Sequence, residues 1–178
     1  MVDYVIEALR GCPQVKKIVV VVPSEKYLDD WVRKEATVVI SAGSMTDNLF
    51  AALKDVDESG LVLVASADIP LLTPGAVADF LERCSRDEAK VYYPIMLKEQ
   101  IEQRFPETIR TYARMKEGSY TGGNIALLDR QTLIANRELL EKFYGLRKSP
   151  LGLAMAVGLA TIIKLILHRL TIKEGEEK

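Results

Sequence analysis

Short apolar runs alternate with segments of helical period along the first half of the chain. Apolar residues at 2, 5, 6 and 9 share one helical face, whereas 18–22 reads IVVVV, which is typical of a strand buried on both sides. The expected elements are helices over 1–9, 27–32, 45–53 and from 74 onward, and strands over 18–22, 37–40 and 61–65. This order predicts an α/β domain with a largely parallel sheet.

Two of these helices carry start signals. Ser44 and Asp47 have the spacing of a capping box ahead of an apolar-periodic segment. Thr73 followed by Pro74 places a cap and a first-turn proline in their preferred positions. We therefore expect helices to begin at Met45 and at Pro74.

The pattern changes in the second half of the chain. A strand candidate over 91–97 is interrupted by Pro94, which indicates an edge or a bulge. Strand-like runs over 108–115 and 121–128 are joined by a turn around Gly118. Helical stretches are expected over 130–144 and 150–169, and no linker interrupts the chain.

The length and the charge of the chain limit the kinds of protein that it can be. The 178 residues fit one domain, expected over 1–172, with a solvated charged tail, KEGEEK, over 173–178. The 24 basic and 25 acidic residues give a net charge of -1, which gives no support to nucleic-acid binding. The apolar run 150–163 is about 14 residues long, against the roughly 20 that a membrane span needs. Cys12 and Cys84 have no metal-ligand spacing, so free thiols and a cytoplasmic location are expected.

Asp68 is an acidic residue at a strand end, the part of an open α/β sheet where ligands usually bind. Asp68 follows the apolar strand 61–65, and the carboxyl ends of strands in α/β sheets are where ligands gather. The alternative is an ordinary turn aspartate. The small residues Ser66 and Ala67 leave the backbone approachable, and a single carboxylate suits Mg2+, which keeps most of its waters and binds substrate phosphates.

The segments SADIPLLT, over 66–73, and TGGN, over 121–124, resemble the MobA-like nucleotidyltransferases. The resemblance implies a three-layer sandwich with a mostly parallel mixed sheet, Rossmann-like and of the nucleotide-diphospho-sugar transferase type. It implies a nucleoside triphosphate and a small-molecule acceptor as partners, with Mg2+ held at Asp68. The implied activity is Mg2+-dependent transfer of a nucleoside monophosphate to the acceptor with release of pyrophosphate.

The resemblance also suggests binding residues. The segment SAGSMTDN, over 41–48, matches the place where members surround the nucleobase, and the acceptor is expected near TGGN. Expected nucleotide-binding residues are Gly43, Ser44, Asn48, Ser66 and Ala67. Expected acceptor-binding residues are Thr121, Gly122, Gly123, Asn124, Arg147 and Lys148. For TGGN the alternative is a simple turn, and for Arg147 and Lys148 it is a solvated charge pair.

Two features of the family are not found. No LAGG-type loop with a following basic residue precedes the first helix, and the family's second metal-binding acid, expected near the C-terminus, has no clear counterpart before 173–178. The first strand of the family sheet is also missing, and it would lie between the strands 18–22 and 61–65. We expect those two strands either to pair directly or to leave open edges that another chain fills, so a homo-oligomer is possible.

Two other classes of enzyme fit the sequence less well. A glycosyltransferase of this fold would have D-x-D, whereas serine stands at position 66, and a dinucleotide-binding oxidoreductase would have glycines where PSEKYLDD follows 18–22. The sequence therefore predicts a nucleotidyltransferase-like protein. The alternative is a non-catalytic or truncated member of the fold that acts in binding or assembly.

Overall fold

The computed structural model describes residues 1–57, 60–85, 88–146 and 170–176, and the chain divides into two compact units. Unit 1 comprises Met1–Tyr92 and Asn124–Arg137, and unit 2 comprises Tyr93–Gly123 and Glu138–Lys178. The sequence, from which one domain is expected, shows no linker at this division. Each unit is built from two separate stretches of chain.

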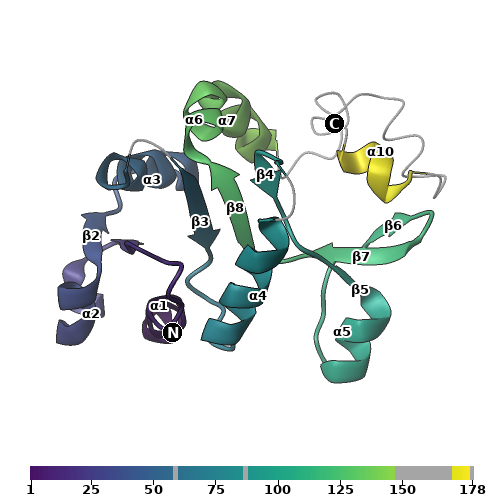
Figure 1. Cartoon of the computed structure of the whole chain (residues 1–178), viewed down its shortest axis with the longest axis horizontal. Coiled ribbons are helices and arrows are strands. Elements are labelled where there is room, and N and C mark those ends of the chain that lie inside the picture. Colours follow the sequence, from purple (N-terminus) through teal and green to yellow (C-terminus); the bar gives the residue numbers. More distant parts are fainter. Residues whose placement is uncertain (58–59, 86–87, 147–169, 177–178) are drawn as a thin grey trace. The chain divides into compact units, whose positions relative to one another are not determined.

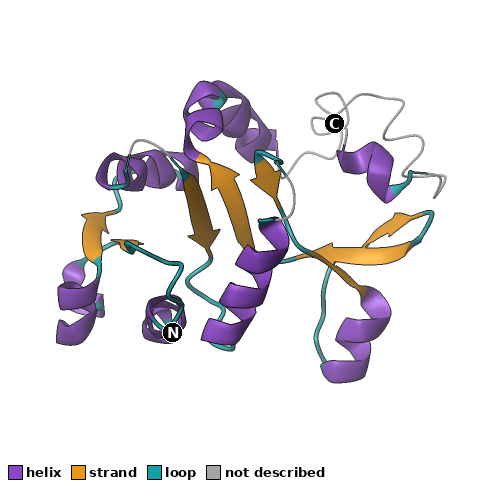
Figure 2. Cartoon of the chain, viewed as in Figure 1, coloured by secondary structure: helices purple, strands orange, loops and turns teal. Residues whose placement is uncertain are grey.

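Helices and strands alternate along unit 1 (Figures 1 and 2). Its elements are α1 (Val2–Arg10), β1 (Val19–Val22), the 3-10 helix η1 (Glu25–Tyr27), α2 (Asp30–Glu35), β2 (Thr37–Ile40), α3 (Met45–Ala52), the 3-10 helix η2 (Leu53–Asp55), β3 (Leu61–Ala65), α4 (Pro74–Cys84), β4 (Val91–Tyr92), β8 (Ile125–Asp129) and α6 (Arg130–Ala135). This alternation confirms the α/β class. The helix starts at Met45 and Pro74 are confirmed as well.

The strands of unit 1 form two small sheets. β1 pairs with β2 in parallel, but β8 lies between β3 and β4 and is antiparallel to both. The expectation of a mostly parallel sheet is therefore not confirmed, because β1–β2 is the parallel pair among the described strands. The physical reason is that β8 arrives after the excursion of the chain through residues 93–123 and runs opposite to its neighbours.

β1 and β3 each have one paired edge in the described structure. β1 lies beside β2, β3 lies beside β8, and the two strands do not pair with each other. The Thr37 amide donates to the Ile18 carbonyl and the Ser41 amide to the Val22 carbonyl, both at 2.9 Å. In a parallel ladder this alternation turns the amides and carbonyls of Val19 and Val21 away from β2. The sequence allows two arrangements: β1 and β3 pair directly, or each leaves one edge open. The described strands show the second arrangement.

The hydrophobic core of unit 1 gathers around α1, β1 and α2. Its buried members are Ile6, Val20, Val22, Leu28, Val32 and Ala36. α1 buries Val5 and Ile6, as the helical spacing of the sequence predicts, together with Ala8, whereas Val2 and Leu9 are half-buried. The Arg10 guanidinium lies 5.6 Å from the centre of the Trp31 ring and 3.5 Å from the Glu35 carboxylate, which covers the outer side of α1 and α2.

Unit 2 is an antiparallel sheet with helices. Its elements are β5 (Ile95–Leu97), α5 (Lys98–Arg104), β6 (Ala113–Met115), β7 (Gly118–Gly122), α7 (Arg137–Leu146, whose first residue belongs to unit 1) and α10 (Ile172–Glu176), and β7 lies between β5 and β6. The expected strand over 108–115 is shorter than predicted. Pro94 separates β4 from β5, which confirms the expected interruption. The helix expected over 150–169 lies outside the described residues.

Part of the charged stretch at the C-terminus is helical. The tail is expected from residue 173, and Ile172–Glu176 forms helix α10. Thr171 and Glu174 make a reciprocal cap, because the Glu174 amide donates to the Thr171 hydroxyl and the Thr171 amide to the Glu174 carboxylate, both at 3.2 Å. This is a capping box, which the spacing Thr-x-x-Glu signals in the sequence.

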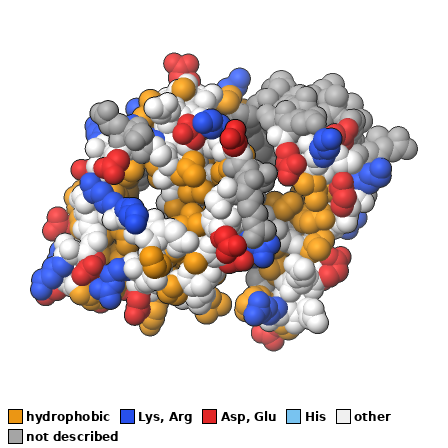
Figure 3. Space-filling view, in the orientation of Figure 1, with side chains coloured by type: hydrophobic (Ala, Val, Ile, Leu, Met, Phe, Trp, Pro, Cys, Tyr) orange, Lys and Arg blue, Asp and Glu red, His pale blue; other side chains and the backbone are white. Residues whose placement is uncertain are grey.

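The described residues contain no helix long and apolar enough to cross a membrane. On the face shown in Figure 3, hydrophobic side chains of unit 1 gather over β3 and β8, and charged side chains lie around them. Both cysteines are free and buried, as expected for small apolar residues of a core.

Candidate functional site

The end of β3 presents Asp68 to solvent. β3 ends at Ala65, and Ser66, Ala67 and Asp68 follow as exposed residues that lead into a turn. The Ser66 amide donates to the Asn124 carbonyl at 2.9 Å, which fixes the start of this turn against the residue that precedes β8. The structure thus brings together Ser66 and Asn124, which lie more than fifty residues apart in the sequence.

One oxygen of the Asp68 carboxylate accepts a hydrogen bond from the protein. The Ser66 hydroxyl donates to Asp68 Oδ1, and no described cation contacts the carboxylate. No group of three or more histidine, cysteine or acidic side chains that could hold a metal ion occurs in the described part of the chain. A single exposed carboxylate does not make a protein-only metal cage. It fits Mg2+, which takes one or two carboxylates and completes its shell with water and phosphate oxygens.

A second group of expected site residues surrounds the start of α3. Asn48 Nδ2 donates to the Ser41 hydroxyl at 2.9 Å, and the Ala42 amide donates to Asn48 Oδ1 at 3.2 Å. The Ser44 amide donates to Asp47 Oδ2 at 2.9 Å, and the Asp47 amide donates to the Ser44 hydroxyl at 3.1 Å. This confirms the capping box. It also means that several polar groups expected to meet a ligand are already bonded within the loop.

Gly43 is required by this packing. A Cβ at position 43 would lie 2.6 Å from Asp47 Oδ2, so the carboxylate occupies the space that a side chain would need. Arg137 reaches the other Asp47 oxygen at 3.4 Å, and its guanidinium lies 4.7 Å from the centre of the Phe50 ring. No hydrogen bond or ion pair between described residues joins this group to Asp68.

The capping box controls the ionisation of Asp47. Hydrogen bonds from the Ser44 side chain and backbone are the main cause that holds the pKa of Asp47 below its ordinary value of 3.8, and the charge of Arg137 is a smaller one. Because the pKa is lowered in the folded state, this stabilisation is fully present above pH 3.8. It is lost as the pH falls through the lower, folded-state pKa.

We expect Ser44→Ala to move the pKa of Asp47 upward, part of the way back to 3.8, because the hydroxyl is lost and the backbone amide remains. The shift can be measured from the carboxyl carbon of Asp47 by NMR during an acid titration. Arg137→Gln is the comparison and should move the pKa less. If Arg137→Gln moves it further than Ser44→Ala, the charge of Arg137 and not the cap controls Asp47.

The TGG segment closes against its own unit. Thr121 is buried, and a Cβ at Gly122 would lie 2.2 Å from the Tyr93 hydroxyl oxygen. A Cβ at Gly123 would lie 2.8 Å from Pro94 Cγ, and the Gly123 amide donates to the Pro94 carbonyl at 2.8 Å. The space on the Cβ side of both glycines is therefore filled by Tyr93 and Pro94, so a larger side chain would not fit at either position.

Sequence reasoning missed two neighbours of this segment. The Tyr93 hydroxyl donates to the Gly123 carbonyl at 2.9 Å, and Arg110 Nη1 donates to the Gly122 carbonyl at 3.4 Å. The hydrogen-bonded residues are 30 and 12 positions apart, and no local pattern joins them. Arg147 and Lys148, also expected to bind the acceptor, lie outside the described residues.

The resemblance noted in the sequence is confirmed by a family comparison. Residues 1–157 match the model of the MobA-like NTP transferase domain. The protein belongs to this family, and thus to the nucleotidyltransferases.

Two solved structures are similar to this chain. It is similar to a hypothetical transferase from Thermus thermophilus, with 41% sequence identity and a TM-score of 0.87 over 99% of this chain and 72% of that one. It is also similar to 4-diphosphocytidyl-2C-methyl-D-erythritol synthase from Anaerococcus prevotii, with a TM-score of 0.57 over 78% of this chain and 63% of that one. The second pair is 13% identical, so this likeness concerns the fold alone. A search of curated proteins found no match.

Proposed function

We propose that the protein binds a nucleoside triphosphate with Mg2+ at the Asp68 turn and transfers the nucleoside monophosphate to a small acceptor. The observation that carries the proposal is the exposed Asp68 turn fixed to Asn124 at the end of β3, in a chain of a nucleotidyltransferase family. The acceptor oxygen forms a bond to the α-phosphorus, the bond from that phosphorus to the bridging oxygen breaks, and pyrophosphate leaves.

Separate groups of residues would bind the two substrates. In this proposal the nucleotide is bound by Gly43, Ser44, Asn48, Ser66 and Ala67, and the acceptor by Thr121, Gly122, Gly123, Asn124, Arg147 and Lys148. Asp68 would hold Mg2+, which when bound neutralises the charge of the phosphates.

The turn has features that suit this role. The Ser66 hydroxyl fixes one carboxylate oxygen of Asp68, so the other oxygen has a defined direction. The Ser66 amide is bonded to the Asn124 carbonyl, which leaves the Asn124 side chain exposed beside the turn and able to donate a hydrogen bond to a substrate oxygen. Such positioning is the main contribution that a protein makes to transfer at phosphorus.

Isothermal titration of the 178-residue chain with GTP, CTP, ATP and UTP, each with and without Mg2+, tests the proposal. We expect one nucleotide to bind, and to bind only with Mg2+. Titration of Mg2+ alone is the control and should give weak binding, because one carboxylate is a poor site without phosphates. A folded chain that binds none of the four would contradict the proposal and favour the alternative of a binding or assembly protein.

A further inference from the structure

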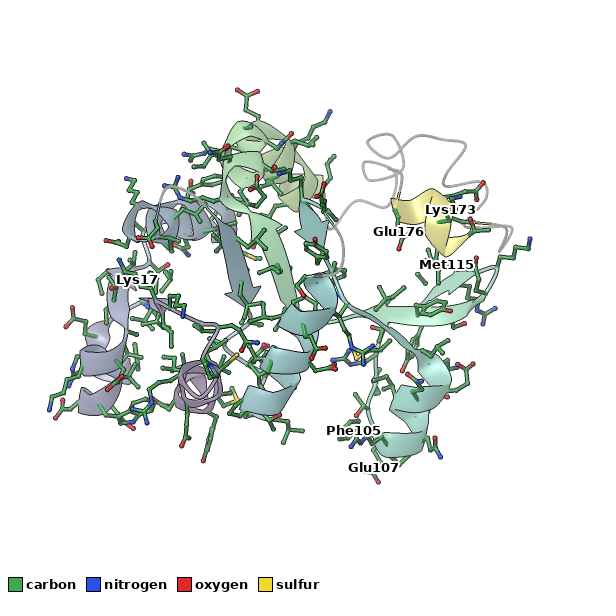
Figure 4. All side chains as sticks on the ribbon, in the orientation of Figure 1. Lys17, Phe105, Glu107, Met115, Lys173 and Glu176 are labelled. Atoms are coloured by element: carbon green, nitrogen blue, oxygen red, sulfur yellow. The ribbon has the colours of Figure 1, made fainter. Side chains whose placement is uncertain are left out.

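A hollow lined by basic side chains lies at the amino ends of β1 and β2 in unit 1. Its volume is about 310 Å3, at the lower end of the range for small-molecule sites. Lys16 and Lys17, from the segment before β1, line it together with Lys34 from the last turn of α2 and with Arg10 from α1. Figure 4 labels Lys17, which stands two residues before β1. We call this space the lysine hollow, and none of the described residues proposed above to bind substrate lines it.

The charges of the three lysines are not neutralised by the protein. In the described part of the chain, no carboxylate forms an ion pair with Lys16, Lys17 or Lys34. Lys16 Nζ makes one long hydrogen bond, 3.4 Å, to the Pro13 carbonyl. Ammonium groups that share one hollow repel each other, and an anion bound among them removes this repulsion. The charge of the lysine hollow therefore suits an anion that several ammonium groups contact together.

Glu35 is the acid among the lining residues, and its carboxylate already has a partner. Glu35 Oε1 lies 3.5 Å from Arg10 Nη1, and the Arg10 guanidinium also lies 5.6 Å from the centre of the Trp31 ring. The charges of Glu35 and Arg10 thus compensate each other. The three lysines give the hollow its net positive charge.

The backbone of the lysine hollow offers further donors. The amides of Lys16, Lys17 and Ile18 donate to no backbone carbonyl of a described residue. The Thr37 side chain also lines the hollow, and its hydroxyl has no hydrogen-bond partner among the residues that the structure describes. Amides and hydroxyls are the groups that add directed hydrogen bonds to the charge of lysines around a phosphate.

Acidic residues beside the lysine hollow limit the size of the anion. Arg10 also borders a second hollow, of about 440 Å3, whose lining includes Asp3, Glu7 and Asp29. A long polyanion that extended past Arg10 would meet these carboxylates, and like charges in contact are unfavourable. The surface therefore fits a compact anion better than a nucleic acid, in agreement with the net charge of -1.

We propose that the lysine hollow binds a compact anion with two or more phosphate groups, at a site separate from the Asp68 turn. Two phosphate groups carry enough charge and enough oxygens to contact all three lysines, whereas a single carboxylate carries one charge. The phosphates can be linked to each other, as in pyrophosphate, or carried apart on a metabolite, as in a sugar bisphosphate.

Isothermal titration of the intact chain without Mg2+, first with pyrophosphate and then with fructose 1,6-bisphosphate, tests the proposal. We expect saturable binding of at least one of them, and the tighter one shows whether the phosphates are linked or apart. Lys17→Gln and Lys34→Gln should each bind about fivefold more weakly, because one charge contact is lost at a solvated site. Added salt should weaken binding by the wild type as well.

Two further variants control this experiment. Lys54→Gln removes an exposed lysine of η2 in the same unit, outside the hollow, and should leave binding unchanged. Glu35→Gln should bind the anion about fivefold more tightly, because it removes the carboxylate of the hollow and releases Arg10. A gain of binding cannot result from loss of the fold. Equal weakening by Lys54→Gln, or no saturable binding of either anion by the wild type, would overturn the proposal.

Asp68→Asn separates this inference from the proposed function. It should bind the anion without Mg2+ as well as the wild type does, because Asp68 does not line the hollow. Lys17→Gln should in turn bind nucleotide with Mg2+ normally. If Asp68→Asn abolishes anion binding and Lys17→Gln leaves it unchanged, the anion binds at the Asp68 turn and the proposed lysine site is wrong. If the wild type binds no nucleotide but still binds the anion through Lys17, the proposed transfer reaction fails and the lysine site stands.

Discussion

Asp68→Asn is expected to weaken Mg2+-dependent nucleotide binding by at least about tenfold and to leave the fold intact. Asparagine has nearly the same shape, and its Oδ1 can still accept a hydrogen bond from the Ser66 hydroxyl. The substitution therefore removes the charge and keeps the turn. The measurement is isothermal titration of the nucleotide that the wild type binds, with circular dichroism as the check of folding.

Asp57→Asn is the comparison for this experiment. Asp57 is an exposed acid of the same unit, outside the proposed site, so its replacement should leave nucleotide binding unchanged. If Asp68→Asn binds the nucleotide with unchanged affinity and unchanged Mg2+ dependence, Asp68 is not part of a metal site. The acid would then be a turn residue, which is the alternative that its sequence position allows.

Ile6→Ala is expected to lower the free energy of unfolding by about 3 kcal/mol. Ile6 is 2% exposed and belongs to the cluster that joins α1 to β1 and α2, so its truncation leaves a cavity that rigid neighbours cannot fill. Urea unfolding followed by circular dichroism measures the loss as a lower midpoint at an unchanged slope.

Ile134→Ala provides the matched case for stability. Ile134 is 46% exposed on α6, so the same chemical change removes far less buried surface and should cost less than about 1 kcal/mol. Equal losses from the two variants would mean that α1 does not pack into the core of unit 1. The difference between them therefore measures the docking of this first helix.

Features governed by neighbouring residues could be predicted from the sequence. The Ser44–Asp47 capping box, the Thr73 cap before Pro74 and the interruption at Pro94 all appear as expected, because each depends on contacts within a few residues. The cap made by Thr171 and Glu174 belongs to the same class. The high charge of KEGEEK is typical of a solvated tail and hides this spacing in the sequence.

Features that depend on distant pairing could not be predicted. The sequence predicts a strand over 121–128, but not that β7 ends at Gly122, nor that β8 over Ile125–Asp129 lies between β3 and β4 and antiparallel to both. For the same reason the position of Asp68 at a strand end was predictable, whereas the bond between Ser66 and Asn124 was not. The glycines of TGGN were noticed in the sequence, but Tyr93 and Pro94, which explain them, lie about thirty residues away.

The route of the chain through the two units has a consequence for divergence. Unit 1 is interrupted between Tyr92 and Asn124, and these residues lie on or next to β4 and β8, which are neighbours in one sheet. An excursion that leaves and re-enters at adjacent strands can be lengthened, shortened or replaced without repacking the core. Residues 93–123 could therefore be exchanged as one insert in a homologue without disturbing the strands of unit 1 or the turn that carries Asp68.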